Sequence, residues 1–443
     1  MTVTNSGIQY AVQIITKHFG NLVAKVCENL LKSGPLNLSA LIRSTKLTPQ
    51  QVKNSLLILV QHNCVQPFAL ESKGGHKVVQ YMAVYDNILH RLRFAKFLSI
   101  VSQELDDDCK QLLAGLLEHG RLTQQQLTDR ANQKSKSNKS QVQNTVQECF
   151  VRLVTSRFVE RCPAPEPFLE EAPLQEGPKK PRSKSAKMVQ VSETIEQRVL
   201  AAAARPMEAV RFSIMTDSET DALSQNNENN SSSMSAGEKR KYDDLDFGGE
   251  LGSNDKEVIL WRANFEQFIR CLRHKACVEN VRTRHDDGAA VVLRAVLKAT
   301  RTAENKVKTD YSVPLKIDAI YTEVIDSEAG RSLTQDRVRA SLSLLCGAPL
   351  VRGVYEDEDE DGDVSYSVDL KKIIELLQTN EVESIVLKRY GKDAYRIFRF
   401  TVKPVKCWSV FETDKISEMA LVDKKEHPRF SISCGRMTTC IWR

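Results

Sequence analysis

The chain has 443 residues, of which 41% are hydrophobic, so it can form about three domains with substantial cores. Its net charge of +6 is slight for this length and does not by itself indicate nucleic-acid binding, and no run approaches the ~18 apolar residues of a membrane span. The N-terminus has neither a basic start nor an apolar core, so we expect no secretory signal. Eleven cysteines scattered singly predict reduced intracellular thiols rather than a zinc site.

Residues 1–85 are predicted to form a winged helix-turn-helix module. An amphipathic first helix ends at Gly34, where glycine can cap it and the following proline prevents continuation, and a short helix over residues 38–47 follows. Thr48 then caps a third helix with one apolar stripe. The stripe consists of Val52, Leu56, Leu59 and Val60. Two strand-like runs around the turn-rich residues 72–76 complete the module as its wing.

The apolar spacing of this third helix recurs along the chain. Positions +4, +7 and +13 from Val52 are apolar, and the same positions from Val338 are apolar as well. A looser copy begins at Val142. Because repeats fix the size of the structural unit, we predict a second winged helix over residues 86–163 and a third over residues 255–370.

The segment between the second and third modules has a different composition. Residues 164–254 are dominated by Pro, Glu, Ser, Asn and Lys, which cannot repay the entropy of ordering, so a disordered linker is predicted. The run 258–265 is predicted to open the third module. Two basic clusters in the linker could act as nuclear import signals. They consist of Lys179, Lys180, Arg182, Lys239, Arg240 and Lys241. After the third module we expect a partial fourth winged helix over residues 371–427 and an irregular tail over residues 428–443.

The outward face of the first module's third helix bears on whether the module reads DNA or docks on protein. Gln50 and Asn54 could bond adenine edges in a major groove. Leu57 and Ile58 do not suit phosphate and fit a protein partner instead. The remaining positive charge is peripheral, in the first wing and in a predicted basic helix over residues 86–105, which is equally consistent with a solvated face. The charged candidates for DNA contact are Lys73, Lys77, Arg91, Arg93 and Lys96. We therefore expect docking mainly on protein, with weak DNA binding that lacks sequence preference.

No motif in the sequence indicates catalysis. There is no glycine-rich phosphate loop, no nucleophile elbow and no zinc-protease helix, so we expect no catalytic residue, no metal and no cofactor. Asp106-Asp107-Asp108 fits the start of a helix, whose dipole it would stabilise, better than a magnesium site. Six consecutive acids at residues 356–361 form the predicted turn of the third wing, where a phosphate backbone would repel them.

Five short segments in order along the chain resemble one family. They are residues 51–63, residues 89–94 (LHRLRF), residues 150–163, residues 260–265 (LWRANF) and residues 396–399 (RIFR). The chain resembles the largest subunit of the RNA polymerase III-specific heterotrimer, a relative of the alpha subunit of general transcription factor IIE, over roughly residues 5–425. The resemblance implies a non-catalytic nuclear subunit of a DNA-directed RNA polymerase. Such a subunit sits on the clamp of the largest subunit together with two smaller partner subunits, and we expect no membrane partner. It also implies a role in promoter recruitment and DNA opening at tRNA and 5S RNA genes.

The end of the chain departs from this family. Members continue through a full fourth module into a C-terminal coiled coil, whereas no heptad run follows Arg399 and residues 434–443 look unrelated. The pattern therefore predicts a truncated or altered C-terminus. Two other functions fit the same modules: a winged-helix DNA-binding transcription regulator, which needs a basic sequence-reading helix, and a winged-helix assembly scaffold of another complex, such as a proteasome lid.

Overall fold

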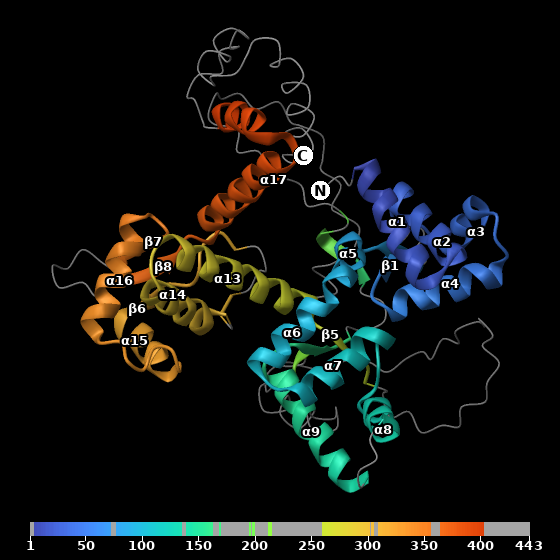
Figure 1. Ribbon diagram of the computed structural model, residues 1–443. Coiled ribbons are helices and arrows are strands. Elements are labelled where there is room, and N and C mark those ends of the chain that lie inside the picture. Colours follow the sequence, from blue (N-terminus) through green and yellow to red (C-terminus); the bar gives the residue numbers. More distant parts are fainter. Residues whose placement is uncertain are drawn as a thin grey trace, which may run out of the picture. The chain divides into compact units, whose positions relative to one another are not determined.

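The structure is a computed structural model that describes residues 4–71, 77–134, 139–162, 168–169, 195, 197–199, 211–214, 259–301, 303–304, 309–355 and 364–402. The chain divides into two compact units, Met1–Phe268 and Ile269–Arg443, which we describe separately (Figure 1).

The first module of unit 1 has the predicted order of three helices and a wing, with one additional helix. Residues expected to form a single long first helix are divided at Gly20, whose φ is +87°, into two helices that pack against each other. The elements are α1 (Asn5–Phe19), α2 (Asn21–Ser33), α3 (Leu38–Thr45), α4 (Pro49–Gln61), β1 (Val65–Glu71) and β2 (Lys77–Ala83). As predicted, Thr48 caps α4. Its hydroxyl accepts from the Gln51 backbone N–H at 3.3 Å, and the Gln51 side chain accepts from the Thr48 backbone N–H at 3.1 Å.

The core of the first module lies between its helices and its wing. Val52, Leu56 and Leu59 of the predicted stripe are buried, and Val60 packs partly buried against the same cluster. The other buried residues of this cluster are Ala11, Ile14, Ile15, Val23, Ala24, Val26, Cys27, Leu30, Leu41, Cys64, Val65, Ala83 and Ile88. The stripe of α4 is therefore the central contact of the module, as its spacing indicates.

A helical connection follows the first wing. The predicted basic helix is divided into α5 (Tyr85–His90), a 3-10 turn η1 (Arg91–Arg93) and α6 (Phe94–Glu104). On α6, Phe97 is fully buried and stacks on Phe268, with ring centroids 4.7 Å apart. The connection is thus packed into unit 1.

The second module consists of α7 (Asp107–His119), α8 (Gln124–Lys134), α9 (Lys139–Thr155), β3 (Val159–Arg161) and β5 (Trp261–Ala263). β5 pairs antiparallel with β3, with Arg161 opposite Trp261, and Leu122 forms a bridge to Trp261 on its other side. This corrects the expectation that residues 258–265 open the third module. The reason is that β3 needs a partner strand, and Trp261 is only 2% exposed where it packs edge-on against Phe150.

Residues 162–260 are consequently an insertion within the wing of the second module, and we call them the wing insertion. They include the predicted linker, most of which was expected to be disordered or only locally helical, and some of its described residues pack within unit 1. β4 (Phe168–Leu169) pairs parallel with β1. Val199 is fully buried against Phe68, Met82 and Val84. The two basic clusters proposed as import signals lie outside the described residues.

Unit 2 contains the third module. Its elements are α13 (Phe265–Arg284, which begins in unit 1), α14 (Asp287–Thr300), β6 (Leu315–Lys316), α15 (Ile317–Asp326), α16 (Gln335–Gly347), β7 (Val351–Tyr355) and β8 (Val364–Val368). Thr334 caps α16 by accepting from the Arg337 backbone N–H at 3.4 Å. Val338, Leu342, Leu345 and Val351, the repeat positions identified in the sequence, are all buried in one cluster. The acidic turn at residues 356–361 lies outside the described residues.

A broken helix, α17 (Leu370–Val402), follows the third wing. Gly391 interrupts it with a φ of +82° and a ψ of −177°. Across this break Ala394 and Phe398 join Val386 in a small apolar cluster. Residues 403–443 lie outside the described residues, so the partial fourth module and the irregular tail remain predictions.

All three modules build their small sheets in the same order. In each module the last strand of the wing lies in the middle of the sheet. It pairs on one side with the segment that precedes the second helix of the winged-helix motif, and on the other side with the first strand of the wing. The three orders are Leu36–β2–β1, Leu122–β5–β3 and β6–β8–β7. The predicted fold class, mainly α with small β wings in tandem winged-helix modules, is confirmed. Among the described residues, no helix has the length and apolar character that a membrane span needs.

Candidate partner-docking surface

The outward face of α4 carries two exposed apolar side chains. Leu57 is 69% exposed and Ile58 is 36% exposed. Asn54 and Gln50, one and two turns nearer the start of the helix, are also exposed, but their side chains bond each other, with Gln50 Nε2 donating to Asn54 Oδ1 at 3.0 Å. The two amides predicted to read adenine are thus paired with each other, and the exposed carbon surface beside them belongs to Leu57 and Ile58.

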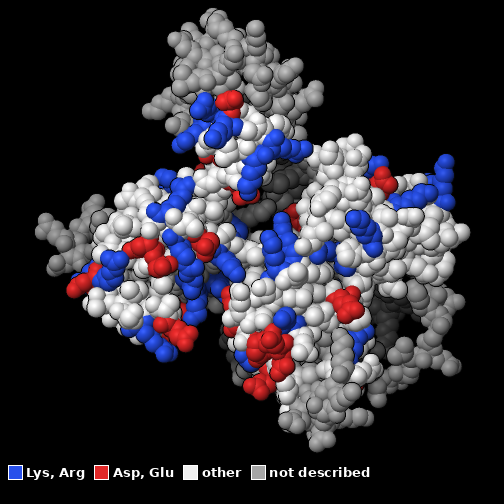
Figure 2. All heavy atoms as spheres, viewed as in Figure 1, with Lys and Arg blue, Asp and Glu red and all other residues white. Residues whose placement is uncertain are grey.

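The charge around this face is positive. Arg43, Lys46 and Lys53 are exposed on α3, at its end and on α4, and residues 38–62 contain no Asp or Glu. Over the α1–α4 module, blue Lys and Arg side chains are more prominent than red acidic ones (Figure 2). Lys53, which lies on the same outward face of α4 as Gln50 and Leu57, is not among the residues predicted from the sequence. Its position four residues before Leu57 could have revealed it.

The other charged candidates for DNA contact lie on different elements. The Arg91 guanidinium lies 4.6 Å from the centroid of the Phe19 ring and 5.3 Å from that of Phe94, and burial lowers the pKa of Arg91. Arg93 is exposed and donates to Nδ1 of His90 at 3.1 Å, and Lys96 is exposed on α6. Lys73 lies outside the described residues, and only the backbone of Lys77 is described. Arg91 is therefore engaged between aromatic rings, a role that its sequence context did not reveal.

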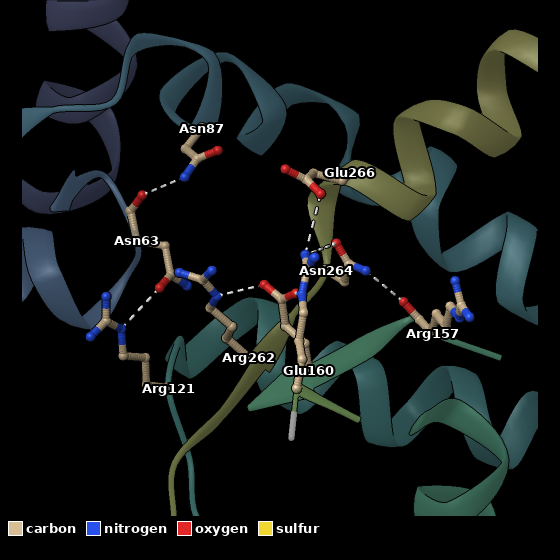
Figure 3. A network of polar contacts seen from close by, with 9 residues as sticks. Asn63, Asn87, Arg121, Arg157, Glu160, Arg262, Asn264 and Glu266 are labelled. Atoms are coloured by element: carbon tan, nitrogen blue, oxygen red, sulfur yellow. Dashed lines mark hydrogen bonds and ion pairs between the residues drawn. The ribbon is translucent and has the colours of Figure 1, made fainter. Parts of the chain in front are cut away.

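The C-terminal end of α4 is fixed against the second module. The Gln61 side-chain amide donates to the carbonyls of His119, at 3.1 Å, and Arg121, and the Arg121 backbone N–H donates to the Gln61 carbonyl at 3.0 Å. Arg121 Nε donates to Asn63 Oδ1 at 2.9 Å, and the Asn87 side chain donates to the Asn63 carbonyl at 2.8 Å (Figure 3). These bonds hold α4 in one orientation relative to the second module and leave its first three turns as the outward surface.

The second module repeats part of this arrangement. Arg157 follows α9 with a φ of +62°, as Asn63 follows α4 with a φ of +57°. The Asn264 side chain donates to the Arg157 carbonyl at 2.9 Å, in the manner of Asn87 and Asn63 (Figure 3). In both the first and the second module, an asparagine beyond the wing thus satisfies the carbonyl of a left-handed residue behind the third helix.

A buried carboxylate anchors the wing insertion. The Glu160 side chain is 4% exposed and accepts from Arg262 Nε at 2.7 Å and from Arg211, which belongs to the insertion. Arg211 also pairs with Glu266 at 3.2 Å. Burial by itself would lower the pKa of Arg262, but the neighbouring Glu160 carboxylate raises that pKa above its ordinary value. Glu160 therefore joins the wing, the insertion and the helix after it.

One group of possible metal ligands occurs in the described residues. A carboxylate oxygen of Asp106 and the sulfurs of Cys109 and Cys149 lie within 4.8 Å of one another. Asp106 caps α7, as predicted, by accepting from the Cys109 backbone N–H at 2.7 Å, and its other oxygen pairs with Arg152. Burial raises the pKa of both thiols, and Cys109 Sγ donates to the Cys149 carbonyl at 3.8 Å. The cluster has the chemistry of a helix cap beside packed thiols.

Comparison with known protein families identifies the family of this chain. Residues 9–70 match the family model described as the RNA polymerase III subunit RPC82 helix-turn-helix domain, and residues 148–349 match the model described as RNA polymerase III subunit RPC82. The chain belongs to the RPC82 family. The first match includes the whole of α4, and the second begins on α9, crosses the wing insertion and ends beyond α16.

Individual RPC82 relatives are similar over most of the chain. Human DNA-directed RNA polymerase III subunit RPC3 is 25% identical over 441 residues, covering 96% of this chain and 73% of the relative. The Danio rerio protein of the same name is 23% identical and covers 93% and 71%. The Dictyostelium discoideum subunit is 29% identical over 182 residues, covering 36% of this chain and 27% of the relative. The family that the sequence resembles is thus confirmed.

Proposed function

We propose that the chain is a non-catalytic subunit of RNA polymerase III that acts in transcription initiation. In this role it docks through its winged-helix modules on the clamp of the largest subunit and on two smaller partner subunits. It assists promoter recruitment and DNA opening at tRNA and 5S RNA genes, with weak DNA contact that lacks sequence preference. It works in the nucleus, and the basic clusters at residues 179–182 and 239–241 serve its import.

The observation that carries this proposal is the match to the RPC82 models over residues 9–70 and 148–349, in the chain order of the modules. Two further features support a docking role over DNA reading and catalysis. Leu57 and Ile58 lie on the outward face of α4, where a DNA-reading helix would carry polar side chains. The polar cluster of buried Glu160 joins the wing, the insertion and the start of α13 through carboxylate–arginine ion pairs, which is a structural role.

Affinity purification of the tagged full chain from its own cells, followed by mass spectrometry, tests the assembly. We expect the large RNA polymerase III subunits to co-purify in near-stoichiometric amounts. Recovery of proteasome-lid or ubiquitin-system proteins in their place would support the scaffold alternative and contradict the proposal.

Transcription from an extract depleted of the chain tests the role in initiation. We expect a tRNA gene and a 5S RNA gene to lose specific transcription and to regain it when the recombinant full chain is added. Elongation from a template with a preformed bubble should remain, because the chain carries no proposed catalytic residue. Undiminished promoter-dependent transcription after complete depletion would refute the initiation role.

A further inference from the structure

We propose that the outward face of α3 and α4 binds an acidic, amphipathic protein segment, an inference that rests on the docking function proposed above. The surface combines Leu57 and Ile58, which we call its apolar centre, with three exposed cations that we call its rim: Lys53, one turn before Leu57 on α4, Arg43 on α3, and Lys46 directly after α3. We call this surface the α4 face. The composition of the α4 face indicates the chemistry of the partner segment, whereas the family match gives no chemistry for it.

The centre of the α4 face is apolar and accessible. Leu57 has the largest exposed fraction among the exposed large hydrophobic side chains of the described residues, and Ile58 adjoins it. An apolar centre within a charged rim is the usual anatomy of a protein interface, where a few desolvated side chains supply most of the affinity. A phosphate backbone gains nothing from contact with leucine, so the centre of this face favours a protein.

The rim of the α4 face has one sign of charge. From residue 4 to residue 70 the chain contains six Lys and Arg residues but a single acid, Glu28. Glu28 already pairs with Lys32 at 2.6 Å. Such a surface attracts an acidic segment and repels a basic one, which sets both the rate of encounter and the choice of partner. The occupant that satisfies rim and centre together is a helix with acidic residues beside leucine-like ones.

Nucleic acid fits the same face less well. A winged helix that reads DNA uses its third helix and its wing. Here the Gln50 and Asn54 amides bond each other, and the end of α4 is bonded to the second module through Gln61. The β1 strand of the wing is paired on both sides, with β2 and with β4. The cations of α3 and α4 therefore accompany exposed apolar side chains and not a free pair of base-reading amides.

Binding of labelled probes to the full-length chain tests the proposal. The first probe is a helical peptide of about five turns, with leucines along one face and glutamates elsewhere. The second replaces its leucines by serine, the third replaces its glutamates by lysine, and the fourth is a DNA duplex of similar length. We expect the first peptide to bind most tightly, and the second and third to bind at least about tenfold more weakly.

Two double variants of the α4 face separate its apolar centre from its charged rim. Leu57→Ser with Ile58→Ser, and Lys46→Glu with Lys53→Glu, should each weaken binding of the first peptide by about tenfold or more. The Lys46→Glu, Lys53→Glu variant should also bind the lysine peptide more tightly than the wild type does. An unfolded protein would not show this gain, so the result distinguishes lost charge complementarity from lost folding. The matched controls lie on α16: Leu344→Ser, at a side chain that is 45% exposed, and Arg339→Glu should leave binding unchanged.

Three results would overturn the proposal. The first is equal affinity for the first and second peptides. The second is a loss of peptide affinity in the α16 controls as large as that in the α4 face variants. The third is a higher affinity for the duplex than for the first peptide, reduced only by the charge variant, which would make the face a nucleic-acid site. Co-purification of polymerase subunits with the tagged wild-type chain is measured in parallel. If the subunits co-purify while no peptide binds, this inference fails alone; if they do not co-purify, the proposed function fails.

Discussion

Asn264 donates its side-chain amide to the carbonyl of Arg157 at 2.9 Å, although the two residues are 107 positions apart in the sequence. The bond closes the second module from the far side of the wing insertion. Asn264 is buried, and Arg157 has a left-handed backbone with a φ of +62°. The second module is therefore complete only when the chain returns from residue 260.

Removal of this amide should destabilise unit 1. Asn264→Ala leaves the Arg157 carbonyl without its side-chain donor, which costs about 1–3 kcal/mol for a buried group. The free energy of unfolding of the full chain in urea measures the loss. Asn144→Ala, at an exposed position on α9, is the matched control and should change stability by no more than about 0.5 kcal/mol. Equal effects of the two substitutions would show that the closing bond is dispensable.

Cleavage within the wing insertion should not separate the two halves of the chain. A specific protease site placed between Asn230 and Ser231 divides the chain before β5, whose pairing with β3 then holds the fragments together. We expect the cleaved protein to elute from size exclusion as one species at micromolar concentration. In the same cleaved protein Trp261→Ala, which removes a buried side chain worth about 3–5 kcal/mol, should release the C-terminal fragment. Separation of the unsubstituted fragments would contradict the strand pairing.

Gly120 should tolerate a side chain less well than Gly34. Both have positive φ, +80° and +78°, so Gly→Ala introduces backbone strain of about 1–3 kcal/mol at either position. A Cβ at Gly120 would also lie 2.1 Å from the Gln61 carbonyl oxygen, whereas a Cβ at Gly34 has no neighbour within 4 Å. Gly120→Ala should therefore lower the midpoint of thermal unfolding further than Gly34→Ala. An equal decrease would show that the first and second modules do not approach as closely at this point.

Acidification should weaken unit 1 through His62. Burial, together with the charges of Arg91, His119 and His18, lowers the pKa of His62 to about 4. The unfolded chain, in which an ordinary histidine has a pKa near 6.5, then binds more protons, so the free energy of unfolding falls as the pH decreases from about 6.5 toward 4. Because the ring is partly accessible, the slope should not exceed about 1 kcal/mol per pH unit.

Substitution of this histidine provides the measurement. Urea unfolding of the full chain between about pH 7.5 and pH 5, a range that spans the ordinary histidine pKa, should show a shallower slope for His62→Gln than for the wild type. His285→Gln, at an exposed position, should leave the slope unchanged. If both variants retain the wild-type slope, other groups control the acid sensitivity.

Local patterns in the sequence predicted much of the fold. The cap at Thr48 and the apolar stripe beginning at Val52 depend on residues three to eight positions apart, so their physical cause is visible in a short window. The recurrence of that stripe at Val338 then indicated repeated modules, and the buried cluster of unit 2 bears this out. Leu57 and Ile58 were identified as exposed for the same reason.

Other features depend on contacts that no local pattern encodes. The strand β5 pairs with β3 across the wing insertion, and its alternating run of apolar residues could only suggest a strand, not its partner. The sequence marks Arg91 as a surface charge, because the rings of Phe19 and Phe94 that enclose it come from separate helices. The outward position of Lys53 was within reach of the helical period but was overlooked.

The pairing of Arg161 with Trp261 has a consequence for how this protein can vary. Everything from residue 162 to residue 260 departs from and returns to adjacent positions of one small sheet. Doubling the length of such an excursion adds only about 0.6 kcal/mol of closure entropy. Evolution could therefore lengthen or shorten this part, or place new recognition sequences in it, while both flanking strands keep their register.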